Sequence, residues 1–414
     1  MAIVVFLLVF TIIVTLHEFG HYYVAKKSGV LVREFALGMG PKVFSWRKGE
    51  TTFTLRALPL GGFVRMAGDG DDTQEIKQGQ RVYLTQNEDG RIVEIDTQDK
   101  PSNTLALPVE VSYCDIVGTM TIKGFVAGES DEQIFVVDDK SMHIEHDGTR
   151  VQVAPLQTHL ETKSAFKRIA IYAAGPINNF LLSIFVFTLL AFSAGGVNSP
   201  SNRVTVSENG VAARIGIQTG DKITAINDTA ITNFSDLTTV MARLRQQHVT
   251  DIDVTYESNH QTKTIRAQLT DGYLGVTQSK DTDIWSKLTY GFTETIVVVK
   301  QVWLALVGLV TNGFNVGQLG GPIAIVQMSG EVAQSGILSI FSFLAILSAN
   351  LGVINLLPIP GLDGGKILLA LIELLRGKPL SKNKEVFVTM IGVGILLLLM
   401  VVVTFNDIAK LFIK

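Results

Sequence analysis

Cysteine and charged side chains are both scarce in this 414-residue chain. It contains one cysteine, Cys114, which excludes an intramolecular disulfide framework and a zinc site built from cysteines. Charged residues make up 18% of the sequence and hydrophobic residues 47%. This balance predicts a membrane protein with water-exposed domains, because an ordinary soluble protein is less apolar and a bare bundle of spans is less charged. A net charge of −3 gives no basic excess with which to bind nucleic acid.

Basic residues are also absent before Lys26, which argues against a secretory signal peptide, since such a peptide begins with a positively charged region. The apolar run at the start of the chain instead leads into His17, Glu18 and His21. Four residues apart on a helix, the two imidazoles project from one face, where they can share a Zn²⁺ while Glu18 acts on a water molecule. Ionisable groups are costly in lipid, so this cluster at the end of a span predicts a functional site.

A third zinc ligand is needed, because catalytic zinc usually has three protein ligands and one open position. Asp363 is the one acidic residue between Glu331 and Glu373, and it follows a stretch interrupted by Pro358 and Pro360. Irregular backbone at membrane depth is tolerated where it is buried in protein or lines a cavity. We therefore predict Asp363 as an oxygen ligand. A helix cap at the membrane edge is the alternative.

Four segments are apolar and long enough to cross about 30 Å of hydrocarbon. The predicted spans lie at residues 1–25, 161–196, 336–376 and 385–407. The segment 281–335 has a shorter apolar core at 295–310 and predicts an interfacial helix followed by a linker. Basic residues cluster after the first span, before the second, and between the third and fourth. The positive-inside rule therefore places these loops in the cytoplasm and both termini outside.

Three further regions are predicted from the segments between the spans. Residues 26–68 form short β-like runs and predict a membrane-associated β region. Residues 69–160 hold 18 acidic and 7 basic side chains among β-branched runs, which predicts an all-β cytoplasmic insert with a solvated acidic surface. Within it, His143 and His146 lack a carboxylate partner on a helix and are predicted to lie at the surface. Residues 197–280 predict a small α+β module.

The module resembles a PDZ domain, in which a turn such as Gly220–Asp221 runs into a strand. Together with the His-Glu-x-x-His motif of the first span and the Asn-x-x-Pro-x-Pro-x-x-Asp-Gly run that begins at Asn355, it resembles the site-2 protease family of intramembrane zinc metalloproteases (peptidase M50). The order of parts is similar to the bacterial RseP, RasP and Eep type, with a single PDZ domain. The implied fold is an α-helical polytopic membrane protein of four spans. It carries a membrane-associated β element, a cytoplasmic all-β insert and an extracytoplasmic PDZ-like α+β domain.

The resemblance also assigns roles to particular residues. It implies that His17, His21 and Asp363 bind Zn²⁺ and that Glu18 is the general base. Five residues are implied to bind substrate: Asn355, Asn178, Gly62, Phe63 and Val64. Asn178 belongs to the run Gly-Pro-Ile-Asn-Asn, which is similar to the family's GPxxN element. The strand around Gly62 could pair with an extended substrate; a purely structural hairpin is the alternative.

The implied function is zinc-dependent intramembrane cleavage of single-span proteins, such as anti-sigma factors or remnant signal peptides, in the bacterial cytoplasmic membrane. The implied partners are these substrates, a peptide or substrate C-terminus on the PDZ-like module, and the lipid bilayer. Two alternatives share the motifs: a membrane-anchored zinc peptidase that cleaves cytoplasmic peptides, and a non-catalytic PDZ receptor with a vestigial site. The position of the cut separates the first from the intramembrane protease, and zinc content separates the second.

Overall fold

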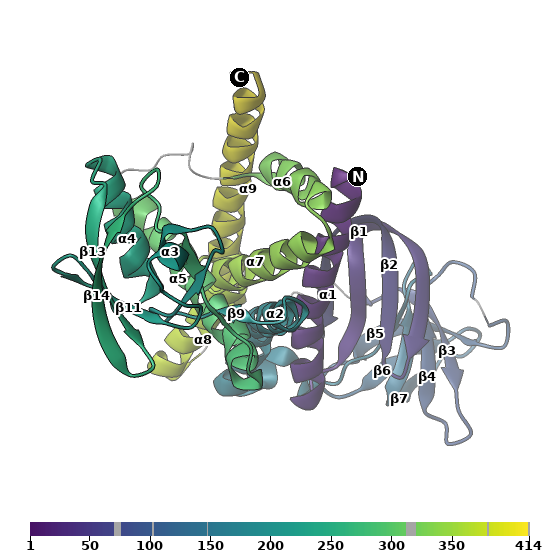
Figure 1. Ribbon diagram of the computed structural model, residues 1–414. Helices are drawn as coiled ribbons and strands as arrows, with labels where there is room; N and C mark the ends of the chain where they lie inside the picture. Colours follow the sequence, from purple (N-terminus) through teal and green to yellow (C-terminus); the bar gives the residue numbers. More distant parts are fainter. Residues whose placement is uncertain (70–75, 102, 147, 312–319, 379–380, 413–414) are drawn as a thin grey trace. The chain divides into compact units, whose positions relative to one another are not determined.

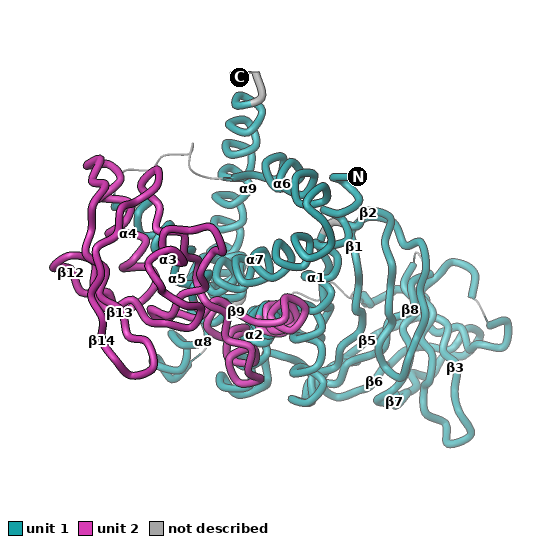
Figure 2. Tube along the Cα trace, viewed as in Figure 1, with its two compact units in different colours: residues 1–183, 297–414 teal, residues 184–296 magenta. Residues whose placement is uncertain are grey.

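The computed structural model describes residues 1–69, 76–101, 103–146, 148–311, 320–378 and 381–412 (Figure 1). The linker part of the predicted segment 281–335 includes 312–319, which lies outside the described residues. The chain divides into two compact units, one of residues 1–183 with 297–414 and the other of residues 184–296 (Figure 2). The first unit contains both motif histidines and Asp363, and the second contains the predicted PDZ-like module.

Among the described residues, five helices are long and apolar enough to cross a membrane. They are α1 (Ala2–Lys27), α2 (Ala165–Ser193), α5 (Ile284–Thr311), α7 (Ile337–Asn355) and α9 (Lys382–Phe412). The helix α5 differs from the short interfacial helix that the sequence predicted at 295–310. It begins eleven residues earlier because Asp283 caps it, accepting a hydrogen bond from the backbone N–H of Ser286 (2.9 Å). By length and composition it is therefore a fifth candidate span.

The predicted third span at 336–376 consists of two helices rather than one. The helix α7 ends at Asn355, and α8 (Asp363–Arg376) begins after the irregular stretch 356–362. Pro358 and Pro360 have no N–H to continue a helical ladder, and Gly361 adopts a φ of +98°, which favours glycine. A further helix, α6 (Pro322–Gln334), precedes α7.

The strands β1 (Val32–Lys48) and β2 (Thr51–Met66) each bend, so their register describes four segments. Their order across the sheet is 42–48, 51–56, 34–37 and 62–66. The last segment pairs with one neighbour only in the described part of the chain, so it forms an edge. That edge runs beside α1, because a Cβ on Gly62 would lie 3.1 Å from Cγ1 of Val14.

The acidic insert is a small sheet that closes on itself. Its strands are β3 (Arg81–Gln86), β4 (Ile92–Asp96), β5 (Leu107–Asp115), β6 (Thr121–Val126), β7 (Glu132–Ile144) and β8 (Arg150–Gln152). They pair in the order β4-β3-β5-β6-β7-β8, and β4 also pairs with β7 in parallel. Closure satisfies strand edges that would otherwise be exposed. Ile92, Val109 and Ile122 are fully buried inside. The strand β3 is not among the strands that the sequence patterns indicated.

His143 is buried, with 1% of its surface exposed, so its predicted surface position is wrong. It lies on β7, where alternate side chains point into the insert. Burial, together with the nearby guanidinium of Arg33, lowers the pKa of His143 to about 4, so the imidazole is neutral in the folded protein. The three-residue spacing to exposed His146 carried no information about which of the two histidines faced inward.

The second unit holds the α+β module. Its elements are β10 (Val204–Val206), α3 (Val211–Arg214), β11 (Lys222–Ile226), β12 (Thr229–Ala230), α4 (Phe234–Gln246), β13 (Asp251–Ser258), β14 (Gln261–Gln268) and β15 (Val276–Gln278). Four strands form a sheet in the order β12-β11-β13-β14, while β10 pairs with β15. The short strands β9 (Val197–Asn198) and β16 (Lys280–Asp281) pair with each other where the chain enters and leaves the module. Asn233 and Asp236 form a capping box that begins α4.

Candidate metal centre

Three potential metal ligands meet between α1 and the start of α8. His17 and His21 are both buried on α1, at 8% and 6% exposed, and their Nε2 atoms lie 3.2 Å apart. Oδ2 of Asp363 lies 3.2 Å from Nε2 of His17 and 3.4 Å from Nε2 of His21. Within the described part of the chain, this is the one group of three His, Cys, Asp or Glu side chains whose donor atoms lie so close together.

Each imidazole is oriented by a group on α2. Nδ1 of His21 lies 2.8 Å from the carbonyl oxygen of Ile171, and a carbonyl only accepts, so Nδ1 carries the hydrogen and Nε2 keeps its lone pair. Nδ1 of His17 lies 3.1 Å from the side-chain amide of Asn179, whose Oδ1 is buried without a partner among the described residues. Turning this amide by 180° lets Oδ1 accept from Nδ1–H of His17. Both histidines then present a free Nε2 lone pair to Asp363.

This arrangement fits a zinc ion. Oδ2 of Asp363 is buried and makes no hydrogen bond to the described residues, so three lone-pair-bearing atoms face one another without a proton between them. A cation resolves that repulsion. Tetrahedral Zn²⁺, with bonds to nitrogen and oxygen of about 2.0–2.1 Å, places its ligand atoms about 3.3 Å apart. The three measured separations of 3.2, 3.2 and 3.4 Å agree with this geometry.

Two glycines allow α2 to approach α1 this closely. A Cβ on Gly175 would overlap Nε2 of His21 and lie 2.7 Å from Cε1 of His17. A Cβ on Gly20 would overlap the carbonyl oxygen of Ala174. Since real Cβ atoms do not make such contacts, a larger residue at either position would push the two helices apart and displace the imidazoles.

Two of the predicted substrate-binding residues lie beside the three ligands. Nδ2 of Asn355, at the end of α7, lies 3.5 Å from Nε2 of His17. A Cβ on Gly62 would lie 3.2 Å from Cγ of Glu18, so the edge segment 62–66 passes the predicted general base. The structure therefore brings the metal group, the base and a strand edge to one place.

The other three predicted substrate-binding residues make structural contacts. The side-chain amide of Asn178 donates to the carbonyl oxygen of Leu16 at 2.8 Å, which clamps α2 to the backbone of α1. The guanidinium of Arg56 lies 5.0 Å from the ring centroid of Phe63. Val64 packs against the buried cluster that surrounds Ala25. Phe63 and Val64 still belong to the exposed strand edge through their backbone.

The comparisons with known proteins decide the family. The model of peptidase family M50 matches residues 5–399. The chain belongs to peptidase family M50. It is 42% identical to "Probable protease eep" of Enterococcus faecalis, over 99% of both chains. It is 41% identical to "Putative zinc metalloprotease" of Streptococcus pneumoniae serotype 4, over the full length of both, and 38% identical to "Regulator of sigma-W protease RasP" of Bacillus subtilis, over 99% of both.

This M50 peptidase is therefore a zinc metalloprotease, as the resemblance of its motifs implied. Zn²⁺ is its cofactor, and its apolar helices make it a multi-pass membrane protein.

Asn179 is the residue that the sequence reasoning missed in this M50 peptidase. The run Gly-Pro-Ile-Asn-Asn contains two asparagines, and counting the GPxxN spacing from Gly175 reaches Asn179 rather than Asn178. Neighbours on a helix point about 100° apart, so only one of the two can face His17. The hydroxyl of Ser348 on α7 donates to the backbone carbonyl of Asn179 at 2.8 Å, which fixes this part of α2 against a third helix.

We predict that Asn179→Leu lowers the affinity for Zn²⁺ by about 10- to 100-fold, because it removes the partner of a ligating imidazole. The matched change Asn178→Leu, at the neighbouring position of α2, removes only a hydrogen bond to the backbone of α1. It should therefore lower the affinity for Zn²⁺ by less. Zinc retained by the purified proteins during titration with a chelator measures both. Equal zinc affinity of Asn179→Leu and the wild type would contradict the role assigned to this amide.

Proposed function

We propose that the chain is an intramembrane endopeptidase that cleaves single-span membrane proteins. The observation that carries this proposal is the depth of the metal group on α1. His17 lies ten residues before Lys27, the basic end of the helix, which corresponds to roughly 15 Å at 1.5 Å per residue. A site that deep in an apolar helix serves substrates that enter the bilayer, because Asp363 and the irregular stretch 356–362 need a protein-lined or watery cavity there.

In the proposed mechanism the chain's own groups handle the protons and hold the substrate. Bound Zn²⁺ supplies a Lewis acid that activates water near neutral pH. Glu18 accepts the proton of the attacking water and then delivers it to the leaving nitrogen of the cut peptide bond. Asn355, beside His17, donates its amide hydrogens to the substrate backbone and keeps the scissile carbonyl in place.

The edge segment 62–66 explains how the protease could cleave a substrate that has unwound from its helix. In an intact helix each carbonyl accepts a hydrogen bond from the fourth residue onward and is shielded by its own turn. Unwinding leaves backbone groups unpaired in lipid, at a cost of several kcal/mol each. We propose that segment 62–66, which has a free side and passes Glu18, pairs with the unwound substrate and replaces those bonds.

The proposed substrate class follows from a relative. The Bacillus subtilis protein named a regulator of sigma-W protease is similar to this chain over almost the whole length of both. We therefore propose anti-sigma factors, and remnant signal peptides of the same single-span form, as substrates. The competing function, a membrane-anchored peptidase for cytoplasmic peptides, uses the same zinc residues and differs in where the cut falls.

Glu18→Gln should abolish cleavage of a single-span test substrate while leaving bound zinc unchanged, because it removes the proton acceptor but none of the three ligands. The assay uses proteoliposomes, and mass spectrometry maps the cut. A zinc-dependent cut inside the apolar span supports the proposal, and a cut confined to the cytoplasmic flank supports the competing function. Cleavage by the variant at the wild-type rate would overturn the assignment of Glu18.

We further propose that the protein lies in the bacterial cytoplasmic membrane with both termini outside, the insert inside, and α5 at the interface. In support, α5 has the lowest mean hydropathy of the five candidate spans and carries Lys287, Glu294 and Lys300. An interfacial α5 leaves four spans, which returns the chain to the side on which it began.

Two matched cysteine variants test this orientation in a Cys114→Ser background. Lys263→Cys, on the exposed surface of the module, should react with a membrane-impermeant maleimide in intact cells. Lys100→Cys, on the exposed surface of the insert, should react only after the cells are opened. Reaction of both in intact cells, or of neither, contradicts the proposed topology.

The module of the second unit is proposed to bind an extended peptide. A cavity of about 500 Å³ lies between α4 and the stretch from Tyr273 to Gln278, and its lining includes Leu237, Met241 and Leu274. The strand β15 pairs with β10 along one side, and its other side faces this cavity. A strand edge beside a helix over an apolar floor is the arrangement by which PDZ domains add a peptide strand.

Thr238→Arg should weaken peptide binding at least tenfold, because Thr238 lines the cavity, whereas Thr239→Arg should not. The two residues are a close match, since both are exposed and both donate their hydroxyls to the carbonyl oxygen of Ser235, at 2.8 and 2.9 Å. A phage library of C-terminal peptides supplies the ligand, and fluorescence polarisation with the full chain gives the affinity. Equal losses in both variants would contradict a peptide site at this cavity.

A further inference from the structure

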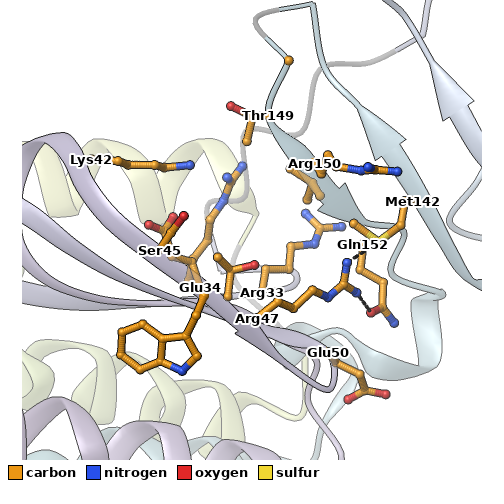
Figure 3. Close-up of a pocket in the computed structure, with 15 residues that line it drawn as sticks. Arg33, Glu34, Lys42, Ser45, Arg47, Glu50, Met142, Thr149, Arg150 and Gln152 are labelled. Atoms are coloured by element: carbon orange, nitrogen blue, oxygen red, sulfur yellow. Dashed lines mark hydrogen bonds between the residues drawn. The ribbon is translucent and has the colours of Figure 1, made fainter. Parts of the chain in front are cut away.

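A cavity of about 480 Å³ lies between the β1–β2 sheet and strands β7 and β8 of the insert (Figure 3). Two contacts join these elements at its wall, since the guanidinium of Arg47 donates to Sδ of Met142 (2.7 Å) and to Oε1 of Gln152 (2.9 Å). Basic side chains outnumber acidic ones among the lining residues. The basic ones are Arg33, Lys42, Arg47, Arg65 and Arg150, and the acidic ones are Glu34 and Glu50.

The strand register explains why cations gather on this face. Arg47 pairs with Thr52, Thr52 with Glu34, and Glu34 with Arg65, so the four side chains form one row across all four segments of the sheet. All four line the cavity. The row therefore faces the insert and carries an arginine at each end.

Arg33 joins the same cavity through an irregularity of the strand. Val32 pairs with Met66 and Glu34 with Arg65, which leaves Arg33 as an extra residue in a β-bulge, a feature that redirects side chains. Arg33 is 7% exposed. Its pKa is lowered to about 10, mainly by burial and then by the charge of Arg65, and the carboxylate of Glu145 opposes this only in part.

The acidic residues at the cavity are already paired with cations that do not line it. Glu34 accepts from Arg56 at 2.8 Å, and Glu50 accepts from Lys26 at 3.0 Å. Arg150 is likewise paired with Glu94. With five basic and two acidic side chains, the lining of the cavity carries a net positive charge.

The outer segment of the same sheet carries a large exposed apolar surface beside these cations. Val43, Phe44 and Trp46 are 67%, 59% and 49% exposed, and they lie between Lys42 and Arg47 on β1. Aromatic and basic side chains in one short strand are typical of the level at which lipid headgroups meet the acyl chains.

We propose that this cavity binds a phosphate group, supplied by an anionic lipid headgroup at the surface of the membrane. Arginine binds phosphate oxygens through its planar fork, and the hydroxyls of Thr52 and Thr149 at the cavity are suited to the remaining oxygens. The apolar segment beside the cavity favours a lipid as the source over free phosphate or an acidic peptide. The proposal does not rest on the proteolytic function, because its site shares no residue with the metal centre.

The test compares two double variants of the full chain in detergent. Lys42→Gln with Arg47→Gln removes two exposed cations of the cavity, and Lys48→Gln with Arg81→Gln removes two exposed cations elsewhere on β1 and the insert. Native mass spectrometry follows binding of phosphatidylglycerol, with phosphatidylcholine as the zwitterionic comparison. Competition by glycerol 1-phosphate and by a glutamate-rich peptide identifies the source of the ligand.

The cavity variant should bind phosphatidylglycerol at least tenfold more weakly than the wild type, and the control variant should bind it as the wild type does. Competition by glycerol 1-phosphate supports the phosphate site with a soluble source, and lack of competition supports a lipid source. Equal binding by the wild type and the cavity variant, equal losses in both variants, or displacement by the acidic peptide alone would overturn the proposal. Unchanged melting of both variants confirms that the comparison is between folded proteins.

Discussion

The close approach of α1 and α2 is the constraint on which the metal centre depends. Gly20 and Gly175 remove the side chains that would separate the two helices. Only at this distance can the carbonyl of Ile171 and the amide of Asn179 reach the outer nitrogens of His21 and His17 and fix both rings. The two histidines need this support because an imidazole that turns freely presents its lone pair in many directions, and most of them face away from the metal.

The stretch between α7 and α8, far from α1 in the sequence, completes the metal centre. The irregular stretch 356–362 ends α7 and begins α8, so Asn355 and Asp363 both arrive next to α1 although a continuous helix would separate them by about 12 Å. The break is costly in lipid unless its backbone is buried in protein. Proline and glycine make it unavoidable, and the metal centre is built around it.

The β1–β2 sheet takes part in both proposed sites, the substrate edge and the phosphate cavity. One edge, at residues 62–66, passes Glu18, while the row with an arginine at each end lies across its face and lines the cavity against the insert. Because the segments are hydrogen-bonded to one another, a ligand held at the cationic face and a substrate strand paired at the edge would bind the same rigid element. This connects the two proposed sites through backbone pairing rather than through direct contact.

The sequence by itself indicated the family, which the comparisons confirm, and predicted three metal ligands, because His17, His21 and Asp363 belong to motifs whose spacing reflects their chemistry. Local patterns also predicted β structure in the insert and mixed α and β structure in the module. Tertiary structure decided what depends on direction. It showed which of two neighbouring asparagines faces His17, that His143 points inward, and that α5 extends to Ile284. It also placed Arg33, Arg47 and Arg65 around one cavity. These features follow from helix rotation, a bulge and strand register, which are set by packing between segments far apart in the sequence.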